Sequence, residues 1–327
     1  MIFKAGQLAF RVLLAGGLMW LATRNASWTE VGAALGRGSW AWFGVCLGLV
    51  VVDRALMAWR WLALLRAVEP APRIPLHQVV RIFFVSTFVG TFLPGSIGGD
   101  AVRAISLTRL GSPAQLAVGS VAVDRLLGTV SVLLMAAGGL ILVGRLIDGR
   151  LLALSVVIAI IGVAGTLLLL FDSSILTGLV RWAGEGRFPT LERLAQKCLT
   201  AIRQYGDHRG VLVGVLLASI GVQALRSAQA WCLGLAIGLT VSGVWYFALI
   251  PFGVLAFLLP FSVSGLGAGT ASFVPLFALV GVPAADAVAL SLLFWFLGVV
   301  GNLPGGILMI VGSNFPRSGL ASSLHRS

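Results

Sequence analysis

The apolar run at residues 77–93 is followed directly by the sequence Pro94-Gly95-Ser96-Ile97-Gly98-Gly99-Asp100. A second apolar run, residues 243–259, is followed directly by Pro260-Phe261-Ser262-Val263-Ser264-Gly265-Leu266-Gly267. Proline removes a backbone donor and glycine is conformationally free, so each run is expected to break at this point. A short helix-like piece follows each break. Both segments are therefore predicted to be helical hairpins with a polar tip rather than simple spans.

The rest of the chain is strongly apolar. Hydrophobic residues occupy 58% of the 327 positions, charged residues only 10%, and the mean hydropathy is +1.02. Because a soluble domain carries about 25% charged residues, this chain has too little polar surface to coat a water-soluble globule. Apolar runs of about 20 residues recur, which is the length a helix needs to cross the bilayer core. An all-α polytopic membrane protein is predicted, with one membrane domain over residues 1–327.

Six spanning helices are predicted in addition to the two hairpins. They cover about residues 5–22, 39–61, 113–142, 151–171, 211–238 and 284–311. The first has no clear cleavage site, which favours an uncleaved signal anchor over a cleaved signal peptide. Residues 172–210 are basic, with apolar residues at helical spacing. They are predicted to form an amphipathic helix on the membrane surface, with a solvated loop as the alternative.

The net charge of +12 does not indicate a nucleic-acid partner. The basic residues lie at the ends of apolar segments, as the positive-inside rule expects, and not in one patch. If both broken segments crossed the membrane completely, the basic segment 172–210 and the C-terminal tail would fall on the wrong side or need additional crossings. If both are re-entrant, that segment and both termini are cytoplasmic. The charge distribution therefore favours re-entrant hairpins.

The two halves of the chain share a spacing. Arg60 lies 34 residues before Pro94, and Arg226 lies 34 residues before Pro260. Each half also has a similar sequence at the start of a long helix, Gly111-Ser112-Pro113-Ala114 and Gly281-Val282-Pro283-Ala284. Three predicted spans separate the hairpins, so repeats over about 5–145 and 151–312 would be inverted, an architecture typical of secondary transporters. Chance similarity between apolar segments is the alternative.

Three stretches resemble the lysylphosphatidylglycerol synthase transmembrane family, which is also labelled flippase-like. They are residues 92–104, the sequence Val123-Asp124-Arg125-Leu126, and the second hairpin tip. The resemblance covers essentially the whole chain and implies a bacterial or archaeal inner-membrane protein. Asp100 and Arg103 occupy the family's acidic and arginine positions. After the second tip, an expected Arg-Glu pair is replaced by Ala268-Gly269-Thr270, so no charged role is expected there.

The resemblance is limited to the lipid-moving half of this family. Its two-part members carry a soluble aminoacyl transferase domain after the membrane part. This chain ends about 16 residues after its last predicted span. Synthase activity is therefore not expected.

Eight charged residues are predicted at membrane depth: Asp53, Arg54, Arg60, Asp100, Arg103, Asp124, Arg125 and Arg226. A charge at the bilayer centre costs about 2.5–3.5 kcal/mol, so such residues are usually paired and functional. Sequence neighbours on a helix point about 100° apart, so Asp53–Arg54 and Asp124–Arg125 are each predicted to need other partners. Asp100 and Arg103 can pair directly if their arm is helical.

We expect Asp124 and Arg125 to reach the Asp100/Arg103 arm. With Arg60 and Arg226 included, the cluster would be a net positive pocket that suits an anionic headgroup. The alternatives are that these ion pairs only hold the bundle together, or that the long arginines extend to the interface. A belt of tryptophans is expected at the interface, formed by Trp40, Trp42, Trp59 and Trp61.

The candidate substrate-binding residues come from the charged cluster and both hairpins. They are Arg60, Pro94, Gly95, Gly98, Gly99, Asp100, Arg103, Asp124, Arg125, Arg226, Ser262, Ser264 and Gly265. This set predicts a transporter that moves a lipid with an anionic or zwitterionic headgroup between leaflets. No G-x-x-x-x-G-K-[ST] loop occurs, so this chain alone is not expected to be ATP-driven.

Two other functions remain open. One is an integral-membrane glycosyl- or phospho-transferase acting on lipid, with Asp100 and Asp124 as acid and base. The other is an accessory subunit of a lipid-modifying system. No cofactor or metal is expected, since the three cysteines are scattered without metal-site spacing. The expected partners are the lipid substrate and either further copies of the chain or a lipid-modifying enzyme.

Overall fold

The computed structural model describes residues 26–68, 74–93, 97–143, 149–171, 199–258 and 266–311, together with Gly17, Trp20, Thr23 and Gln196. Regular structure in these residues is helical, with no strand. The helices are α2 (Trp28–Gly36), α3 (Trp40–Val68), α4 (Leu76–Phe92), α5 (Ile97–Arg109), α6 (Ala114–Val143), α7 (Gly149–Phe171), α10 (Arg209–Ala236), α11 (Gly243–Leu258), α12 (Leu266–Ala278) and α13 (Ala284–Val311). The predicted all-α class is confirmed.

Four helices are long and apolar enough to cross a membrane, namely α3, α10, α13 and the Ala114–Ile141 part of α6. They coincide with four of the six predicted spans. The predicted span 151–171 falls within α7, and the predicted span 5–22 lies outside the described residues except for Gly17 and Trp20. The helices therefore form a polytopic membrane bundle, while the number of crossings stays a prediction.

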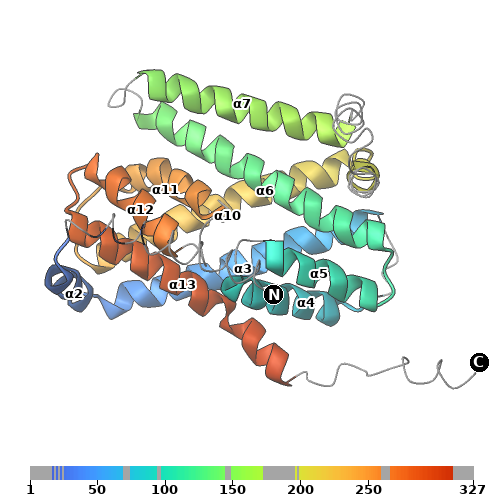
Figure 1. Cartoon of the computed structure of the whole chain (residues 1–327), viewed down its shortest axis with the longest axis horizontal. Helices are drawn as coiled ribbons and strands as arrows, with labels where there is room; N and C mark the ends of the chain where they lie inside the picture. Colours follow the sequence, from blue (N-terminus) through green and yellow to red (C-terminus); the bar gives the residue numbers. More distant parts are fainter. Residues whose placement is uncertain are drawn as a thin grey trace, which may run out of the picture.

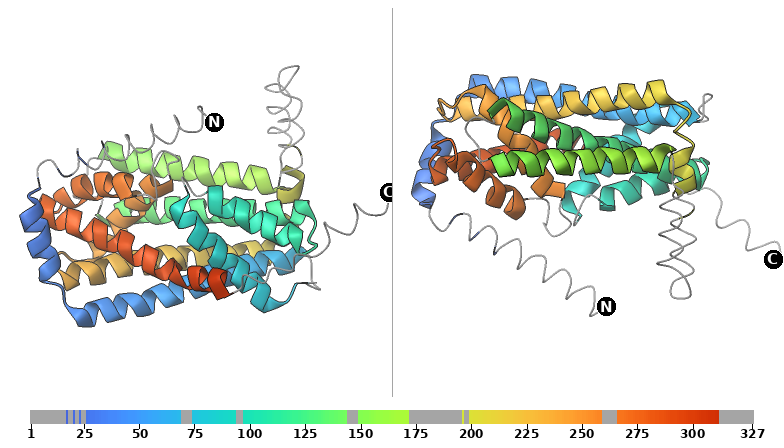
Figure 2. Two further views of the ribbon diagram at one scale, coloured as in Figure 1. Left: turned by 60° about the horizontal axis from the view of Figure 1, so that its bottom comes forward. Right: turned by 90° about the horizontal axis from the view of Figure 1, so that it is seen from above.

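Two groups of four helices show the same succession of lengths. Helices α3 to α6 contain 29, 17, 13 and 30 residues, and helices α10 to α13 contain 28, 16, 13 and 28. In each group the two short helices pack against each other, α4 on α5 and α11 on α12. The two short pairs occupy opposite ends of the bundle, as all three ribbon views show (Figures 1 and 2). The predicted tips, residues 94–96 and 259–265, lie outside the described residues.

The turn after the second short helix is built alike in both groups. Gly111 follows α5 with φ 93°, and Gly281 follows α12 with φ 76°. The next N–H closes the helix end in each case, from Ser112 to the Leu107 carbonyl (3.2 Å) and from Val282 to the Phe277 carbonyl (3.1 Å). Glycine is the residue that adopts this left-handed conformation at least cost. The sequence similarity at these two turns therefore extends to their backbone conformation.

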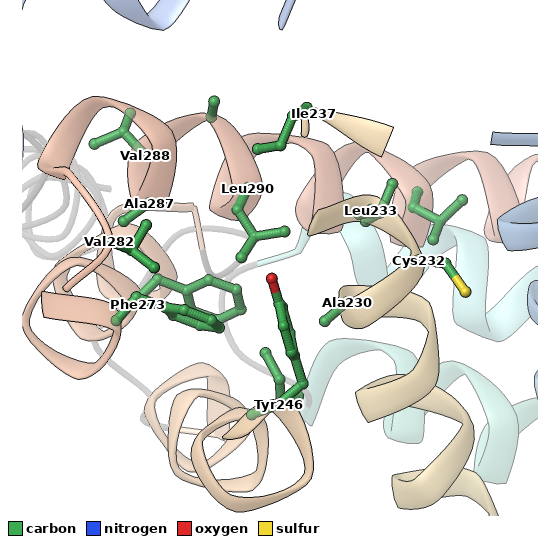
Figure 3. Packing of buried hydrophobic residues seen from close by; sticks show 14 of the residues in the cluster. Ala230, Cys232, Leu233, Ile237, Tyr246, Phe273, Val282, Ala287, Val288 and Leu290 are labelled. Carbon is green, nitrogen blue, oxygen red and sulfur yellow. The ribbon is translucent and has the colours of Figure 1, made fainter. Parts of the chain in front are cut away.

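The core of the second group is apolar and aromatic. The ring of Tyr246 in α11 faces Phe273 of α12, with Ala230 of α10 beside it (Figure 3). Gly234 of α10 allows this packing, because a Cβ at that position would lie 2.7 Å from Tyr246 Cζ. Helices α3 and α10 pack side by side and join the two groups.

The described end of segment 172–210 packs against the bundle. Leu199, Ile202 and Tyr205 are buried with Leu64 of α3 and Val123 of α6. Burial raises the pKa of the Tyr205 phenol, so this side chain stays neutral. Residues 172–195 lie outside the described residues, and the surface helix there stays a prediction.

Candidate functional site

Two ion pairs cross between α5 and α6. Arg125 donates from Nη2 to Asp100 Oδ1 at 2.8 Å, and its Nε lies 2.8 Å from Asp100 Oδ2. Arg103 Nη1 lies 3.4 Å from Asp124 Oδ2. The expected contact of Asp124 and Arg125 with the helix that carries Asp100 and Arg103, which is α5, is therefore present. Asp100 and Arg103, expected as a possible direct pair, each pair instead with a residue of α6.

Arg60 adds a third helix to this cluster. Its Nη2 lies 2.5 Å from Asp124 Oδ1 and also donates to the Asp124 backbone carbonyl at 3.2 Å. Asp124 thus joins two guanidinium groups, one from α3 and one from α5. Both Arg60 and Asp124 are buried. Arg60 therefore lies inside the bundle and does not extend to an interface.

Aromatic faces cover Arg103 on its other sides. Its Cζ lies 5.0 Å from the Trp61 ring centroid and 4.9 Å from that of Phe83. Such cation–π contacts offset part of the cost of burying a guanidinium. Arg103 Nε donates to Ser86 Oγ at 3.4 Å, and Trp61 donates from Nε1 to Ser120 Oγ at 3.3 Å.

The expectation that Trp61 belongs to an interfacial belt is wrong. Trp61 is completely buried, whereas Trp40, Trp42 and Trp59 are exposed. Trp61 lies eight residues after Asp53, which places both on one side of α3. That spacing is compatible with a buried Trp61 but does not determine its place. Nothing in the spacing indicated the other partners of Arg103 and Trp61, which are Phe83, Ser86 and Ser120.

A second charged cluster lies between α3 and α10. Arg54 Nη1 contacts Asp53 Oδ2 at 2.9 Å, and Arg226 Nε lies 3.6 Å from Asp53 Oδ1. Asp53 has the additional partner that was predicted, Arg226, but it also pairs with its neighbour Arg54, because the long arginine side chain folds back. Both arginines also reach the Met57 sulfur, at 3.3 Å from Arg54 and 3.5 Å from Arg226. Arg226 pairs with Asp53 here, and its expected grouping with Arg60 in one pocket stays a prediction.

The described hairpin glycines bring α4 and α5 together. A Cβ at Gly99 would lie 2.7 Å from the Ser86 carbonyl oxygen and 3.1 Å from Gly90 Cα. A Cβ at Gly98 would lie 2.6 Å from Leu93 Cβ. These two glycines therefore hold the arms in contact and position the adjacent Asp100.

The hairpin tips themselves are not described. The remaining predicted residues Pro94, Gly95, Ser262, Ser264 and Gly265 lie outside the described residues. Their roles as substrate-binding residues stay predictions.

Both clusters carry an excess of arginine. Asp100 and Asp124 face three arginines in the first cluster, and Asp53 faces two in the second. Each cluster is left with one positive charge in excess. Among the residues that the structure describes, no group of three His, Cys, Asp or Glu side chains is placed to hold a metal ion. The guanidinium groups in excess give each cluster donors of the kind that bind anions.

Long apolar helices with arginine–aspartate clusters buried between them define a polytopic integral membrane protein. The chain belongs to the family described as the lysylphosphatidylglycerol synthase TM region, whose model matches residues 8–305. It is also similar to a protein of Methanothermobacter thermautotrophicus described as a UPF0104 membrane protein. The two are 25% identical over an alignment of 272 residues. The alignment covers 76% of this chain and 77% of the relative. The family resemblance seen in the sequence is confirmed.

Proposed function

We propose that this protein moves a lipid with an anionic or zwitterionic headgroup between the two leaflets, without ATP hydrolysis of its own. The observation that carries the proposal is the buried cluster formed by Arg60, Arg103, Arg125, Asp100 and Asp124. One positive charge in excess lies there among otherwise apolar helices. A charged side chain at membrane depth costs free energy, and such residues typically line substrate pathways. An anionic headgroup supplies the missing negative charge.

In this proposal the short helix pairs α4–α5 and α11–α12 are re-entrant hairpins of an inverted repeat. Their matched lengths, their matched glycine turns and their places at opposite ends of the bundle support it (Figure 1). Asp100 lies in the first turn of α5, directly after the first tip. The headgroup passes the charged cluster beside this hairpin, while the acyl chains stay in the lipid.

Arg125 is the residue of the first cluster that a headgroup reaches most readily. Its side chain is 43% exposed, whereas those of Arg60 and Arg103 are each 5% exposed. A phosphate oxygen can replace one Asp100 oxygen on Arg125, since both are charge-assisted acceptors of the same guanidinium fork. The positive charge of the buried Arg60–Asp124–Arg103 group then adds to the attraction of the phosphate.

Lipid exchange in reconstituted vesicles tests the proposal. Fluorescent phosphatidylglycerol is placed in both leaflets, and a membrane-impermeant reductant destroys the label on the outer side. We expect wild-type protein to expose the inner pool to the reductant, and Arg103→Gln to slow this at least about tenfold, as for loss of one charged hydrogen-bonding group. Arg109→Gln, an exposed arginine on the same helix, is the matched control.

Two results would contradict lipid transport through this site. One is exchange in the Arg103→Gln protein at the wild-type rate. The other is chemical conversion of the lipid, detected by mass spectrometry, which would favour a lipid transferase instead.

A further inference from the structure

The cluster of Asp53, Arg54 and Arg226 lies deep in the bundle. Asp53 is at the centre of α3 (Trp40–Val68), and its side chain is 3% exposed. Arg54 Nη2 lies 3.5 Å from the carbonyl of Gly298, which is at the centre of α13 (Ala284–Val311). Residues near the middle of a helix that spans the bilayer lie inside its hydrocarbon core. This cluster therefore places an arginine excess inside the core, where a charge is costly.

Both clusters contain polar atoms without a hydrogen-bond partner among the described residues, and in the first cluster these are Arg60 Nε and Arg125 Nε. Asp53 Oδ1 and Arg54 Nε have no hydrogen-bond partner within the part of the chain that the structure describes. Arg54 makes two other contacts. The Met57 sulfur is a weak acceptor, and the hydrogen bond to the Gly298 carbonyl is long. Arginine offers five N–H donors. Arg54 Nε is therefore a donor without an acceptor among the described residues, and it lies beside Asp53 and Met57, which Arg226 also contacts.

We propose that Arg54 and Arg226 form a second anion-binding site, at the bilayer midplane, for the phosphodiester of a lipid headgroup that carries a net negative charge. The single positive excess matches the single negative charge of a phosphodiester. Phosphate oxygens are the acceptors that an arginine fork binds best. The apolar surroundings of the site suit a headgroup that arrives attached to acyl chains. Arg226, with a side chain 24% exposed, provides access.

This inference rests on the proposed lipid transport and gives its path two steps. Arg54 and Arg60 are six residues apart on α3, which is about 9 Å along a helix axis. The two positive clusters thus follow one another along the same helix. A headgroup leaving the Arg60–Asp124–Arg103 group meets the next uncompensated charge about 1.7 helical turns further along α3. The Asp53 carboxylate limits the attraction, so that the headgroup is released again.

Photo-crosslinking tests the site without depending on transport. Phosphatidylglycerol carrying benzophenone on its headgroup is incorporated in vesicles with the protein, since benzophenone reacts preferentially with methionine side chains. Met57 contacts both arginines and is the reporter. We expect an adduct on Met57, mapped by peptide mass spectrometry, that unlabelled phosphatidylglycerol suppresses and phosphatidylcholine does not. Glycerophosphoglycerol, the same headgroup without acyl chains, should not suppress it.

Charge-balanced variants separate binding from a structural role. Arg54→Gln leaves no positive excess and should lower the Met57 adduct at least about tenfold. The double change Asp53→Asn with Arg54→Gln restores one excess charge through Arg226, and should recover the adduct to within about threefold of wild type. Arg54→Lys keeps the charge and should retain most of the adduct. Arg66→Gln, exposed on the same helix, is the control.

Several results would overturn the inference. If Asp53 and Arg54 only brace the bundle, the double variant will be at least as impaired as Arg54→Gln alone. Suppression by glycerophosphoglycerol would overturn the assignment to a lipid. A Met57 adduct in a protein that does not exchange lipid would disprove the proposed transport while supporting this site. Exchange without a phosphatidylglycerol-specific adduct would disprove the site alone.

Discussion

Arg103 of α5 lies over the indole ring of Trp61 of α3, with its Cζ 5.0 Å from the ring centroid. Phe83 of α4 covers the guanidinium from a second direction at 4.9 Å. The arginine is therefore held by two aromatic faces and shares its carboxylate, Asp124, with Arg60. Ring faces attract a cation without cancelling its charge. This arrangement fixes the arginine in the bundle and leaves its charge available to a ligand.

Replacing Trp61 should affect stability and transport to different degrees. Trp61→Ala removes a completely buried ring and should cost about 3–5 kcal/mol of unfolding free energy. Trp61→Phe keeps an aromatic face for Arg103 and loses the hydrogen bond to Ser120, so it should cost about 1–2 kcal/mol and retain lipid exchange. Unfolding in mixed detergent micelles measures the first quantity, and the vesicle assay the second. Equal losses for the two variants would rule out a role for the ring face.

A methyl group at Gly99 should open the α4–α5 pair. Its Cβ would lie 2.7 Å from the Ser86 carbonyl oxygen, so the two helices must move apart, at a cost of about 1–3 kcal/mol. Asp100, the next residue, would shift with its helix relative to Arg125 of α6. We expect Gly99→Ala to slow lipid exchange more than it lowers stability.

Gly138→Ala on α6 is the matched control for Gly99→Ala. A Cβ there has no neighbouring heavy atom within 4 Å, and alanine favours a helix over glycine. This variant should be neutral or slightly stabilising. If both alanine variants exchange lipid alike, close packing of the hairpin arms does not position the site.

The sequence predicts helix breaks and charges better than it predicts partners. Pro94 and the glycines after it mark the break between α4 and α5, because they act on the local backbone. The pairing of Asp124 with Arg103 follows once charges at membrane depth must find each other. The contact of Arg54 with its neighbour Asp53 does not follow, since it depends on side-chain rotamers. The place of Trp61 depends on how α3, α4 and α5 meet, which helical spacing alone does not determine.

The two halves fill the same positions with different chemistry. Arg103 lies eight residues before Gly111, and Phe273 lies eight before Gly281; Asp124 and Phe294 each lie thirteen residues after those glycines. Arg103 and Asp124 form an ion pair, whereas the rings of Phe273 and Phe294 lie 5.6 Å apart. The aromatic pair occupies in the second half the place of the ion pair in the first. The absence of charge after the second tip in the sequence is consistent with this substitution.

This difference predicts that the second half supplies stability and the first supplies transport. Phe273→Ala removes a completely buried ring and should cost about 3–5 kcal/mol of unfolding free energy. Its lipid exchange, normalised to folded protein, should remain within about twofold of wild type, since the ring pair belongs to α12 and α13 whereas the first charged cluster belongs to α3, α5 and α6. Asp124→Asn should show the reverse pattern, with slowed exchange exceeding the loss of stability. A shared pattern in both variants would contradict the division between the halves.

The proposed opposite orientation of the two hairpins predicts opposite labelling of two exposed positions. Gln115 follows the α5–α6 turn and Leu279 follows α12, and the two turns lie at opposite ends of the bundle (Figure 1). Single cysteines are introduced there after all three native cysteines are replaced by alanine. Basic residues accumulate on the cytoplasmic side, and Arg109 adjoins the first turn. A membrane-impermeant maleimide should therefore label Leu279→Cys in intact cells and Gln115→Cys only after permeabilisation. Labelling of both from one side would mean that one helix pair crosses the membrane completely, and the inverted repeat would be excluded.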